Sequence, residues 1–316
     1  MRVAVTGATG TVGHPLVDAL TKRGDDVTAL SRDPERARRA LAEGEGPGTV
    51  ETATWAHPKA ELPPADALRG RDAVVHLLGE QIAQRWSDSA KHEIRDSRIL
   101  STRNLVTALA DLPEAERPRV LVSQSGAGWY GHRADERLDE SEPAGDDFVA
   151  RLSVEWEREA GRAAELGLRV VVNRTGVVLS GSGGALEKML PFFKAGVGGP
   201  VAGGRQYVPW VHLDDVLGAI LFELDTEAVS GPVNLTAPEP VTNRELSKTL
   251  GRVLRRPAFA PVPGLAVRAL YGEMAEIVTT GQRAIPGRLT ALGYRFRQPE
   301  LEPALRDATG STRAGA

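Results

Sequence analysis

The sequence predicts an α/β protein with a doubly wound parallel sheet and a smaller C-terminal lobe. Three observations support this fold class. Short apolar runs alternate with helical patterns from the first residues onward, which is typical of βαβ units. Several runs are continuous stretches of valine and leucine, as expected for strands that are buried on both faces. After residue 179 this alternation is lost, and glycine and proline become frequent.

The chain opens with a βαβ unit. RVAVTGA (2–8) is expected to be a strand, residues 12–22 a helix with apolar residues four apart, and DVTALSR (26–32) a second strand. Further strands are expected at 50–54, 72–78, 119–125 and 168–179, with helices at 88–110 and 147–166. The C-terminal part is expected to hold a helix at 214–225, a strand at 233–236 and helical stretches at 243–255 and 263–279.

These elements divide the chain into two lobes and a tail. The first lobe is expected to comprise residues 1–179 and 211–235, and the smaller second lobe residues 180–210 and 236–308. Residues 309–316 are small and polar, and we expect them to form a flexible tail.

Composition and charge limit the possible functions. The chain has 316 residues, of which 41% are hydrophobic, and a net charge of −3 without long charged runs, so no nucleic-acid partner is expected. No apolar stretch approaches the roughly 20 residues of a membrane-spanning helix. The chain has no cysteine, and its six histidines are scattered, so no metal site is expected. Because Met1 leads directly into a strand, we expect a cytoplasmic protein. The sequence does not predict an oligomeric state.

A phosphate-binding loop is predicted between the first strand and the first helix. VTGATGTVG (5–13) spaces three glycines three residues apart. The first glycine permits the turn, the second lets the backbone approach a pyrophosphate, and the third lets the helix pack on the strand. The strand before the loop and the amphipathic helix after it are the context that this motif requires. The predicted phosphate-binding residues are Gly7, Thr9, Gly10, Thr11, Val12 and Gly13.

The end of the second strand indicates which dinucleotide the loop would hold. In NAD sites a carboxylate at this position typically accepts a hydrogen bond from the ribose 2′-hydroxyl. This chain has Ser31 and Arg32 instead, a hydroxyl and a guanidinium suited to a 2′-phosphate. The alternative is an arginine that is only solvated at the strand end. We predict that the cofactor is NADP(H).

The fourth expected strand ends in HLLGE (76–80). We predict that Leu77, Leu78 and Gly79 lie along the adenosine-side ribose and the pyrophosphate. Glu80 either faces the active site, where it would contact substrate, or belongs to the loop surface.

Further motifs, taken with GATGTVG and HLLG, carry a resemblance to a known superfamily. They include SR-x3-TR (97–103), SGAGWYG (125–131), NRTGVVL (173–179), GGALEKMLPFF (183–193), GGRQYVPWVHLDDV (203–216) and GQRAIPGRL (281–289). The chain resembles the extended short-chain dehydrogenase/reductase superfamily and, more narrowly, its atypical branch, the epimerase family proteins. The resemblance covers about residues 1–307. It implies an NADP-binding Rossmann domain with a small C-terminal substrate lobe.

The chain departs from the wider superfamily at its usual tyrosine and lysine, which stand four residues apart. In GDDFVARLSVEWE (145–157), Phe148 and Leu152 stand at these places. In the superfamily the tyrosine exchanges a proton with the substrate oxygen, while the lysine lowers the pKa of the tyrosine and holds the nicotinamide ribose. The resemblance implies that the atypical branch generally lacks this pair. Ordinary epimerisation through a keto intermediate is therefore not supported by these two residues.

Two residues are candidates for the missing proton-handling role. Ser125 lies near the carboxyl end of the fifth strand, where ligands of open α/β sheets bind, and it matches the superfamily's serine. Its alternative role is a hydrogen bond to the backbone. Tyr130 carries a phenol that can donate a proton, although a tyrosine beside Trp129 can instead form a packed wall of the pocket.

One helix and one strand supply further predicted cofactor contacts. Arg95, Arg98 and Thr102 fall on one helical face, with Glu93 nearby. Arg98 stands at about the place of a structural asparagine of the superfamily, so we predict that it and Glu93 contact the cofactor. The residues predicted to pass near the nicotinamide are Arg174, Thr175, Gly176 and Val178.

The C-terminal part offers predicted substrate contacts, namely Arg205, Gln206 and Trp210. His212 and Asp214 in WVHLDDV (210–216) resemble a catalytic His–Asp pair. Because Asp214 is well placed to cap the next helix, we expect both to be structural.

Two functions are compatible with these residues. One is an NADP(H)-dependent epimerase or oxidoreductase that acts on a small polar substrate, such as a sugar nucleotide or another metabolite. The other is a non-catalytic NADP-sensing or interaction protein, since some members of the resembling branch are named for roles in cell or plastid division. The polar groups of Arg98, Arg205 and Gln206 favour a substrate and therefore the enzyme.

Overall fold

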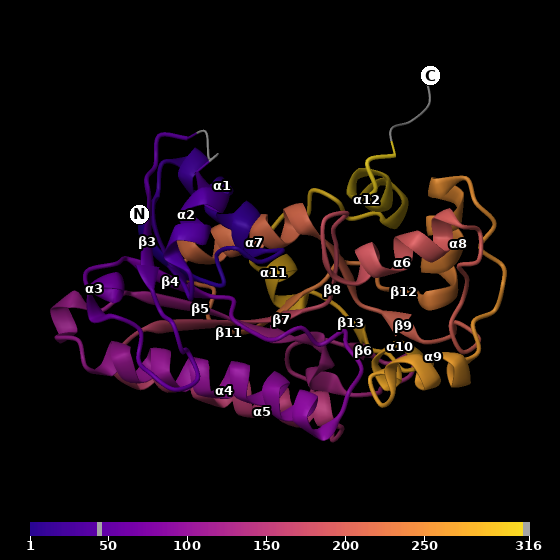
Figure 1. Ribbon diagram of the computed structural model, residues 1–316, viewed down its shortest axis with the longest axis horizontal. Helices are drawn as coiled ribbons and strands as arrows, with labels where there is room; N and C mark the ends of the chain where they lie inside the picture. The colour runs from indigo at the N-terminus through magenta and orange to yellow at the C-terminus, as the bar shows by residue number, and fades with distance from the viewer. Residues whose placement is uncertain (43–45, 312–316) are drawn as a thin grey trace.

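The computed structural model describes residues 1–42 and 46–311. Of the expected tail, residues 312–316 lie outside this described part. A central sheet stands between two layers of helices, and a second lobe lies beside it (Figure 1). None of the described helices is long and apolar enough to span a membrane.

The central sheet confirms the predicted fold class. Its seven strands are all paired in parallel, in the order β11-β7-β5-β4-β1-β2-β3. The strand order reverses beside β1, which pairs with β2 on one side and with β4 on the other, and ligands of such sheets bind outside the carboxyl ends at this point. The strands are β1 (Arg2–Thr6), β2 (Asp26–Ser31), β3 (Val50–Thr54), β4 (Ala73–His76), β5 (Val120–Gly126), β7 (Arg169–Thr175) and β11 (Gly231–Leu235).

Two apolar layers hold the helices against the sheet. Alternate strand residues face opposite sides, so that Val3 and Val5 pack into one core and Ala4 into the other. The first core receives α1 (Gly13–Arg23), α2 (Pro34–Leu41), α7 (Leu213–Asp225) and α11 (Gly287–Ala291). The second receives α3 (Ala65–Leu68), α4 (Asp88–Ala110), α5 (Phe148–Gly161) and the 3-10 helix η3 (Arg162–Leu166).

The strand expected at 168–179 is two strands. β7 ends at Thr175, and β8 (Val177–Leu179) leaves the central sheet to pair with β10 (Trp210–His212). Gly176 forms the break, because the backbone of Pro209 passes so close that a Cβ on residue 176 would lie 1.9 Å from the Pro209 oxygen. The continuous apolar run therefore concealed a change of sheet.

The second lobe contains more regular structure than the sequence indicated. The sequence predicts no regular element between residues 180 and 210, yet α6 (Gly184–Lys194) is a helix that buries Leu186, Leu190 and Phe193. These side chains share a core with Trp210, α8 (Asn243–Leu254) and α12 (Leu301–Ala308). The remaining elements are β9 (Tyr207–Val208), β12 (Val241–Thr242), α9 (Gly264–Tyr271), α10 (Ala275–Thr279), β6 (Arg137–Leu138), β13 (Arg283–Ala284) and the 3-10 helices η1 (Glu114–Glu116) and η2 (Ala127–Tyr130).

The boundary between the lobes differs in one place from the expected one. Leu289, Tyr294 and Phe296 fall within 236–308, yet they pack on the core of the central sheet. The Tyr294 hydroxyl also donates a hydrogen bond to the backbone oxygen of Asp215 in α7. This part of the chain returns to the first lobe. The remaining division into lobes stays an interpretation.

Candidate functional site

The glycine loop has the geometry of a phosphate cradle. Gly7 has a φ of +68°, which favours glycine, and a Cβ there would lie 3.0 Å from the Leu77 backbone. A Cβ on Gly13 would lie 2.0 Å from the Gly7 oxygen, so only glycine lets α1 start this close to β1. No side chain caps α1 at Val12. Because the His14 N–H donates to the Gly10 oxygen at 3.0 Å and Pro15 has no N–H, an anion would be bound by the amides of Val12 and Gly13. The exposed Thr9, Gly10 and Thr11 complete the loop.

The loop between β8 and α6 passes against this cradle. A Cβ on Gly183 would lie 2.4 Å from the Oγ1 atom of Thr11. The second lobe therefore reaches the phosphate loop directly. Val178 of β8, the strand that leads into this loop, is half-buried and packs on the core of the central sheet.

At the end of β2, Arg32 is exposed, and within residues 1–42 and 46–311 its guanidinium has no hydrogen bond or ion pair. Ser31 is engaged locally, since its hydroxyl donates to the Asp33 oxygen at 3.1 Å and accepts from the Asp33 N–H at 3.2 Å. The Asp33 carboxylate caps α2 by accepting from the Arg36 N–H at 2.9 Å. Arg32 is thus the free cation at this strand end.

Arg98 lies beneath the loop that follows β4. The residue is 7% exposed, its Nη1 donates to the Ile94 oxygen at 3.0 Å, and its guanidinium lies 5.2 Å from the Trp156 ring centre. A Cβ on Gly79 would lie 3.0 Å from the Arg98 Cζ. Burial lowers the pKa of Arg98 to about 10, against the opposing influence of the Glu80 carboxylate. The buried Nε has no partner among the described residues, so a donor directly under this loop is left unsatisfied.

The other residues of the loop after β4 are half-buried against the cores of the central sheet or at the edge of the loop. Leu77 and Leu78 are half-buried, Leu77 against the first core and Leu78 against the second. The Glu80 N–H donates to the Ser97 Oγ at 2.9 Å. Because Glu80 is half-buried, its position does not decide between a substrate contact and a place on the loop surface.

Glu93 does not lie where the sequence placed it. Its side chain is 46% exposed and forms an ion pair with Lys59 at 2.7 Å, on the outer surface of α4. Arg95 is also partly exposed and pairs with Asp96 and Glu155. The 3.6-residue period is satisfied along α4, but its apolar packing turns Arg98 inward and leaves Arg95 at the edge. A cofactor contact by Glu93 is therefore not supported.

Behind the loop, a buried hydrogen-bonded chain joins β1, β4 and two helices. The His76 Nδ1 lies 2.8 Å from the Thr6 Oγ1 and its Nε2 lies 3.0 Å from the Thr102 Oγ1, which also accepts from the Trp156 Nε1 at 2.9 Å. Burial lowers the pKa of His76 to about 3. Both ring nitrogens are satisfied within the core, so His76 acts as a neutral tie between elements.

Ser125 donates a hydrogen bond to the Glu157 Oε1 at 2.8 Å. Glu157 comes from α5 and binds Arg174 of β7 in bidentate fashion, with the Arg174 Nε and Nη2 both at 3.0 Å from its oxygens. All three side chains are largely buried, with Ser125 6% exposed. The Arg174 guanidinium also stacks on Trp129, 3.8 Å from the ring centre. The serine therefore has a carboxylate partner, which the alternative of a backbone hydrogen bond did not include.

Tyr130 is a wall of this site rather than an accessible acid. It has no exposed surface, and its hydroxyl donates to the Asn234 Oδ1 at 2.7 Å and lies 3.0 Å from the Asp139 oxygen. Arg174 donates to the same hydroxyl at 3.2 Å. Burial raises the pKa of Tyr130 to about 12, which the hydrogen bond from Arg174 partly opposes. Proton transfer from Tyr130 to a substrate is therefore not supported.

Phe148 and Leu152 belong to an apolar cluster. Leu152 is 4% exposed and packs with Ile94 and Trp156. Phe148 meets the Trp86 ring edge-on, with the ring centres 5.1 Å apart, and the Lys91 ammonium lies 5.4 Å from the Phe148 ring centre. Lys91 in turn forms an ion pair with Glu273 of the second lobe. The place of the usual tyrosine and lysine is filled by packing that joins the lobes.

The predicted nicotinamide contacts after β7 are partly reassigned. The Thr175 hydroxyl donates to the Gln124 Oε1 at 2.7 Å and is half-buried at the carboxyl edge. Gly176 is needed for the approach of the Pro209 backbone, not for space around a ligand. Arg174 is turned to Glu157 and Trp129, as described above.

The three predicted substrate residues lie in different surroundings. Arg205 is exposed and forms no hydrogen bond or ion pair within the described chain. The Gln206 amide donates to the Val201 and Val278 oxygens at 3.1 and 2.7 Å and holds backbone together. Trp210 is fully buried in the core of the second lobe, and its Nε1 donates to the Glu239 oxygen at 3.0 Å. A substrate contact by Trp210 is therefore not supported.

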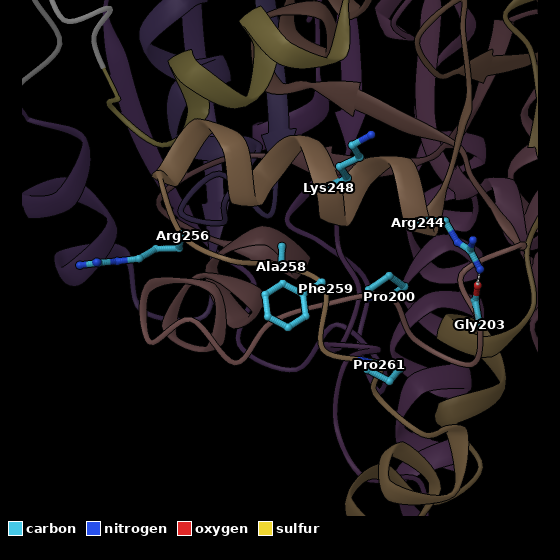
Figure 2. Close-up of a pocket in the computed structure, with 8 residues that line it drawn as sticks. All are labelled: Pro200, Gly203, Arg244, Lys248, Arg256, Ala258, Phe259 and Pro261. Atoms are coloured by element: carbon cyan, nitrogen blue, oxygen red, sulfur yellow. Dashed lines mark hydrogen bonds between the residues drawn. The ribbon is translucent and has the colours of Figure 1, made fainter.

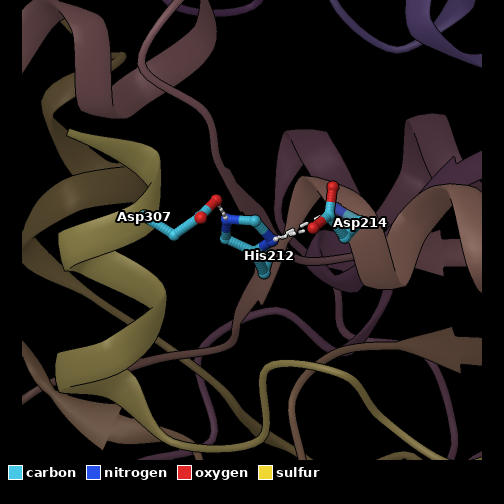
Figure 3. Close-up of side chains that lie close together, drawn as sticks. All are labelled: His212, Asp214 and Asp307. Atoms are coloured by element: carbon cyan, nitrogen blue, oxygen red, sulfur yellow. Dashed lines mark hydrogen bonds and ion pairs between the residues drawn. The ribbon is translucent and has the colours of Figure 1, made fainter. Parts of the chain in front are cut away.

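His212 rather than Asp214 caps α7. The His212 Nδ1 accepts from the Asp214 N–H at 3.2 Å, and its Nε2 faces the Asp307 carboxylate at 3.2 Å (Figure 3). Ligand atoms of His212, Asp214 and Asp307 lie within 4.8 Å of one another, close enough for a metal ion. However, the nitrogen nearer Asp214 already accepts a backbone hydrogen bond, and the other nitrogen is left to donate to Asp307. This geometry favours a link between α12 and α7.

Sequence reasoning missed Glu157 and Asn234 as members of the site. Glu157 stands in the WE pair (156–157), but nothing local shows that it reaches a serine 32 residues earlier. Asn234 orients Tyr130 from β11 across 104 residues. A carboxylate two helical turns after Phe148 was the available signal for Glu157.

The fold, the uncapped glycine cradle and the free arginine after β2 define a dinucleotide-binding protein of the Rossmann class. Residues 3–235 match the model of the NAD dependent epimerase/dehydratase family, and the chain belongs to this family. Residues 262–308 match a domain of unknown function, DUF1731.

Similar proteins are found in plants and animals. The chain is 39% identical over 308 residues to the Arabidopsis thaliana "Epimerase family protein SDR39U1 homolog, chloroplastic", covering 97% of this chain and 86% of the relative. It is 38% identical over 312 residues to human "Epimerase family protein SDR39U1", covering 97% and 99%. The resemblance to the epimerase family proteins is therefore confirmed.

Two solved structures extend the comparison. The crystal structure of human SDR39U1 (isoform2) with NADPH matches with a TM-score of 0.84 and 36% identity, covering 99% of this chain and 100% of the other. A nucleoside-diphosphate sugar epimerase from Corynebacterium glutamicum matches with a TM-score of 0.75 and 32% identity, covering 98% of this chain and 58% of the other. The cofactor in the human structure is the one that Arg32 predicts for this chain.

Proposed function

We propose that the protein is an NADP(H)-dependent enzyme that transfers hydride to or from a small polar substrate, as an oxidoreductase or as an epimerase. Ser125, positioned by Glu157, handles the proton in place of the missing tyrosine and lysine. The hydrogen bond from Ser125 to Glu157 is the observation that carries this proposal. The proposed location of this enzyme is the cytoplasm.

The residues at the carboxyl edge fit the cofactor. The cradle around Gly7 and Gly13 suits the pyrophosphate, and the exposed Arg32 suits a 2′-phosphate. The unsatisfied Nε of Arg98 supplies a donor under the adjoining loop, where an oxygen-rich ligand would relieve it. When bound, NADP(H) supplies the hydride donor or acceptor.

Ser125 and Glu157 can move one proton in a concerted way. As a substrate carbinol is oxidised, its carbon-bound hydrogen leaves as hydride, and its hydroxyl proton passes to the Ser125 Oγ. The Ser125 proton moves at the same time to the Glu157 carboxylate, along the 2.8 Å hydrogen bond. Arg174 holds that carboxylate in place with two hydrogen bonds. In reduction the same proton returns to the substrate oxygen.

The substrate class is suggested by relatives. The Corynebacterium glutamicum protein is named a nucleoside-diphosphate sugar epimerase, so sugar nucleotides are the first compounds to test. Arg205 is an exposed and unpaired cation of the second lobe that would suit an anionic substrate.

One observation favours the alternative, a non-catalytic protein that senses NADP(H). Phe148 and Leu152 are integrated into a cluster that joins the two lobes, so this part of the site is built for packing. A bound cofactor would then stabilise a surface rather than react.

The cofactor is tested by calorimetric titration with NADPH and NADH. Arg32→Ala should weaken NADPH binding by about 1–3 kcal/mol and leave NADH nearly unchanged, since a charge-assisted contact is lost. Arg39→Ala is the matched control, because Arg39 is another exposed arginine of the same region without a partner in the described chain. Equal affinities for NADPH and NADH in the wild type contradict the 2′-phosphate assignment.

Catalysis is tested by a metabolite screen, including sugar nucleotides, that follows NADPH oxidation, NADP reduction and loss of substrate hydrogen label. With an active substrate, Ser125→Ala and Glu157→Gln should each lower kcat by roughly 10²–10⁴-fold and keep NADPH affinity. Ser141→Ala, an exposed serine on a surface turn, is the control. Binding of NADPH without turnover of any compound supports the sensing protein instead.

A further inference from the structure

The second lobe carries a concentration of positive charge that the cofactor site does not use. Residues 244–256 contain five cations and one acid in a chain whose net charge is −3. Arg252 is neutralised by Glu302 of α12. For Arg244, Lys248 and Arg256, in contrast, no carboxylate within the described residues forms an ion pair. Arg244 and Lys248 stand four residues apart on α8, so their like charges repel unless an anion lies between them.

These three cations stand around the rim of one cavity. The cavity has a volume of about 460 Å³, which is sufficient for a small molecule. Figure 2 shows that the three side chains point in different directions. Arg244 turns to the Gly203 oxygen, to which it donates a hydrogen bond at 2.8 Å, Lys248 points away from Phe259, and Arg256 extends outward from the start of the loop that follows α8. The rest of the lining is mainly apolar, from Ala258, Phe259 and Pro261, and none of the lining residues is acidic.

Phe259 gives the cavity an aromatic edge. This side chain is 83% exposed, although burial of an aromatic ring is ordinarily favourable. An exposed ring near cations that form no ion pair within the described residues can cover a planar or apolar ligand body while the cations bind its anionic groups.

The walls of the cavity are held by backbone contacts. The Val262 N–H donates to the Pro200 oxygen at 2.9 Å, and the Ala202 N–H donates to the Val262 oxygen at 3.0 Å. A Cβ on Gly251 of α8 would lie 2.3 Å from the Ala258 Cβ, so the loop is pressed against the helix. A ligand would therefore meet a preformed surface and order only exposed side chains.

A second cavity shares the same cations. It has a volume of about 500 Å³, lies along α8 toward α12, and is also lined by Arg244 and Lys248. Glu245 and Glu302 also line this second cavity, whereas no acidic residue lines the first. The first cavity is therefore the one suited to an anion.

We propose that the first cavity is a second ligand site, which binds a phosphorylated small molecule with a planar or apolar body. Its body lies against Phe259, and its phosphate groups are bound by the cations at the rim, Arg244, Lys248 and Arg256. Guanidinium and ammonium groups together are the donors that phosphate oxygens prefer. The site is separate from the glycine cradle, which belongs to the other lobe.

The test uses the full chain and the fluorescent probe 8-anilino-1-naphthalene sulfonate, which combines an anion with an aromatic body. Binding is followed by fluorescence with and without saturating NADPH, and inorganic pyrophosphate is the competitor. The variants are Lys248→Gln with Arg256→Gln, and separately Phe259→Ser. Arg158→Gln is the control, because Arg158 is an exposed cation on α5 without a partner in the described structure. All these side chains are exposed, and melting curves verify that the variants fold.

We expect NADPH-independent binding of the probe and its displacement by pyrophosphate. The double variant should weaken the binding about tenfold or more, and Phe259→Ser should weaken it roughly threefold to tenfold, while Arg158→Gln has no effect. Equal binding by wild type and double variant overturns the proposal, as does failure of pyrophosphate to compete. Binding of a polyglutamate peptide at these residues without binding of either small anion also overturns it and indicates an acidic polypeptide partner.

Discussion

Placing the superfamily's tyrosine and lysine at positions 148 and 152 should destabilise this protein rather than create a conventional dehydrogenase. The change is Phe148→Tyr with Leu152→Lys. Leu152 is 4% exposed and packs with Ile94, Ile99 and Trp156, so the new ammonium would lie among apolar groups. Phe148 is half-buried against Trp86.

The magnitude follows from the burial of Leu152. Cutting a buried leucine to alanine typically costs about 2–5 kcal/mol, of which the lysine stem recovers a part. Apolar surroundings can lower the pKa of a buried lysine by up to roughly 3–5 units, and each unit corresponds to about 1.4 kcal/mol. Because a lysine can bend toward water, we expect a net loss of about 3–5 kcal/mol. This is a large part of the roughly 5–15 kcal/mol by which proteins are stable.

The assay is urea unfolding at about pH 7 and about pH 9.5, with Leu152→Met as the matched control. Methionine has a similar length without charge and should lose less than about 1.5 kcal/mol. The folded-state pKa of the new lysine would lie below its unfolded value, so the unfolded chain binds more protons between the two values. The stability of the lysine variant should therefore rise with pH across that window, whereas that of the methionine variant should not.

Carbonyl reduction by NADPH is measured on the same proteins with keto-sugars and simple ketones. A phenol must stand within hydrogen-bond reach of the substrate oxygen, and an error of about 1 Å can lower the rate on the order of a hundredfold. Robust new reductase activity with unchanged stability would refute the reasoning. It would mean that the apolar cluster is a conventional site lacking only two polar groups.

Three further predictions concern buried groups. Tyr130→Phe should destabilise the protein by about 1–3 kcal/mol, because the buried Asn234 oxygen loses its donor, while NADPH affinity is unchanged in calorimetry; a lost affinity would indicate a cofactor contact instead. Gly176→Ala should destabilise by about 3 kcal/mol or more in urea unfolding, since its Cβ would lie 1.9 Å from the Pro209 oxygen, whereas Gly161→Ala, with no atom within 4 Å of the added Cβ, should not. Burial raises the pKa of Glu223 to about 8, whereas the unfolded chain releases this proton above about pH 4.3. Between about pH 4.3 and pH 8 the folded state therefore binds more protons than the unfolded chain. The contribution of Glu223 to the free energy of unfolding should fall there by about 1.4 kcal/mol for each unit of rising pH. Glu223→Gln should remove this contribution above about pH 6.5, where His76 no longer titrates in the unfolded chain, and an unchanged slope there contradicts the assignment.

The parts of the fold and site that sequence predicted are those with local causes. Within the phosphate loop, Gly10 and Gly13 lie against the Gly7 oxygen, a contact within six residues, and Gly7 itself has a positive φ, although it also lies close to the distant Leu77 backbone. The position of Arg32 follows from the end of one strand. The helix 88–110 was predicted at its observed bounds, with Ser87 as a side-chain cap on the Ala90 N–H.

The parts that sequence missed depend on partners far along the chain. Nothing within the apolar run 168–179 indicates that the chain changes sheet there. The break at Gly176 is caused by the close approach of the Pro209 backbone, 33 residues later. Trp210 was expected at the substrate and lies in a core whose other members include side chains of α6, α8 and α12. α6 was concealed by the glycines before it and by Pro191 inside it. A local pattern cannot distinguish a cleft wall from a core when the second layer is unknown.

The helix α5 explains how the site can lack its usual pair and still hold a largely buried carboxylate beside Ser125. Phe148, Leu152 and Trp156 follow one another at four-residue intervals, and this stripe packs into the cluster that also holds the second lobe. One residue after Trp156, the helix turns Glu157 toward β5 and β7, where it meets Ser125 and Arg174. In this family member, therefore, the helix face that usually carries the acid stabilises the lobes, and the adjacent face carries a carboxylate to the same serine. A search for tyrosine and lysine at positions 148 and 152 therefore overlooks the carboxylate that the same helix places beside Ser125.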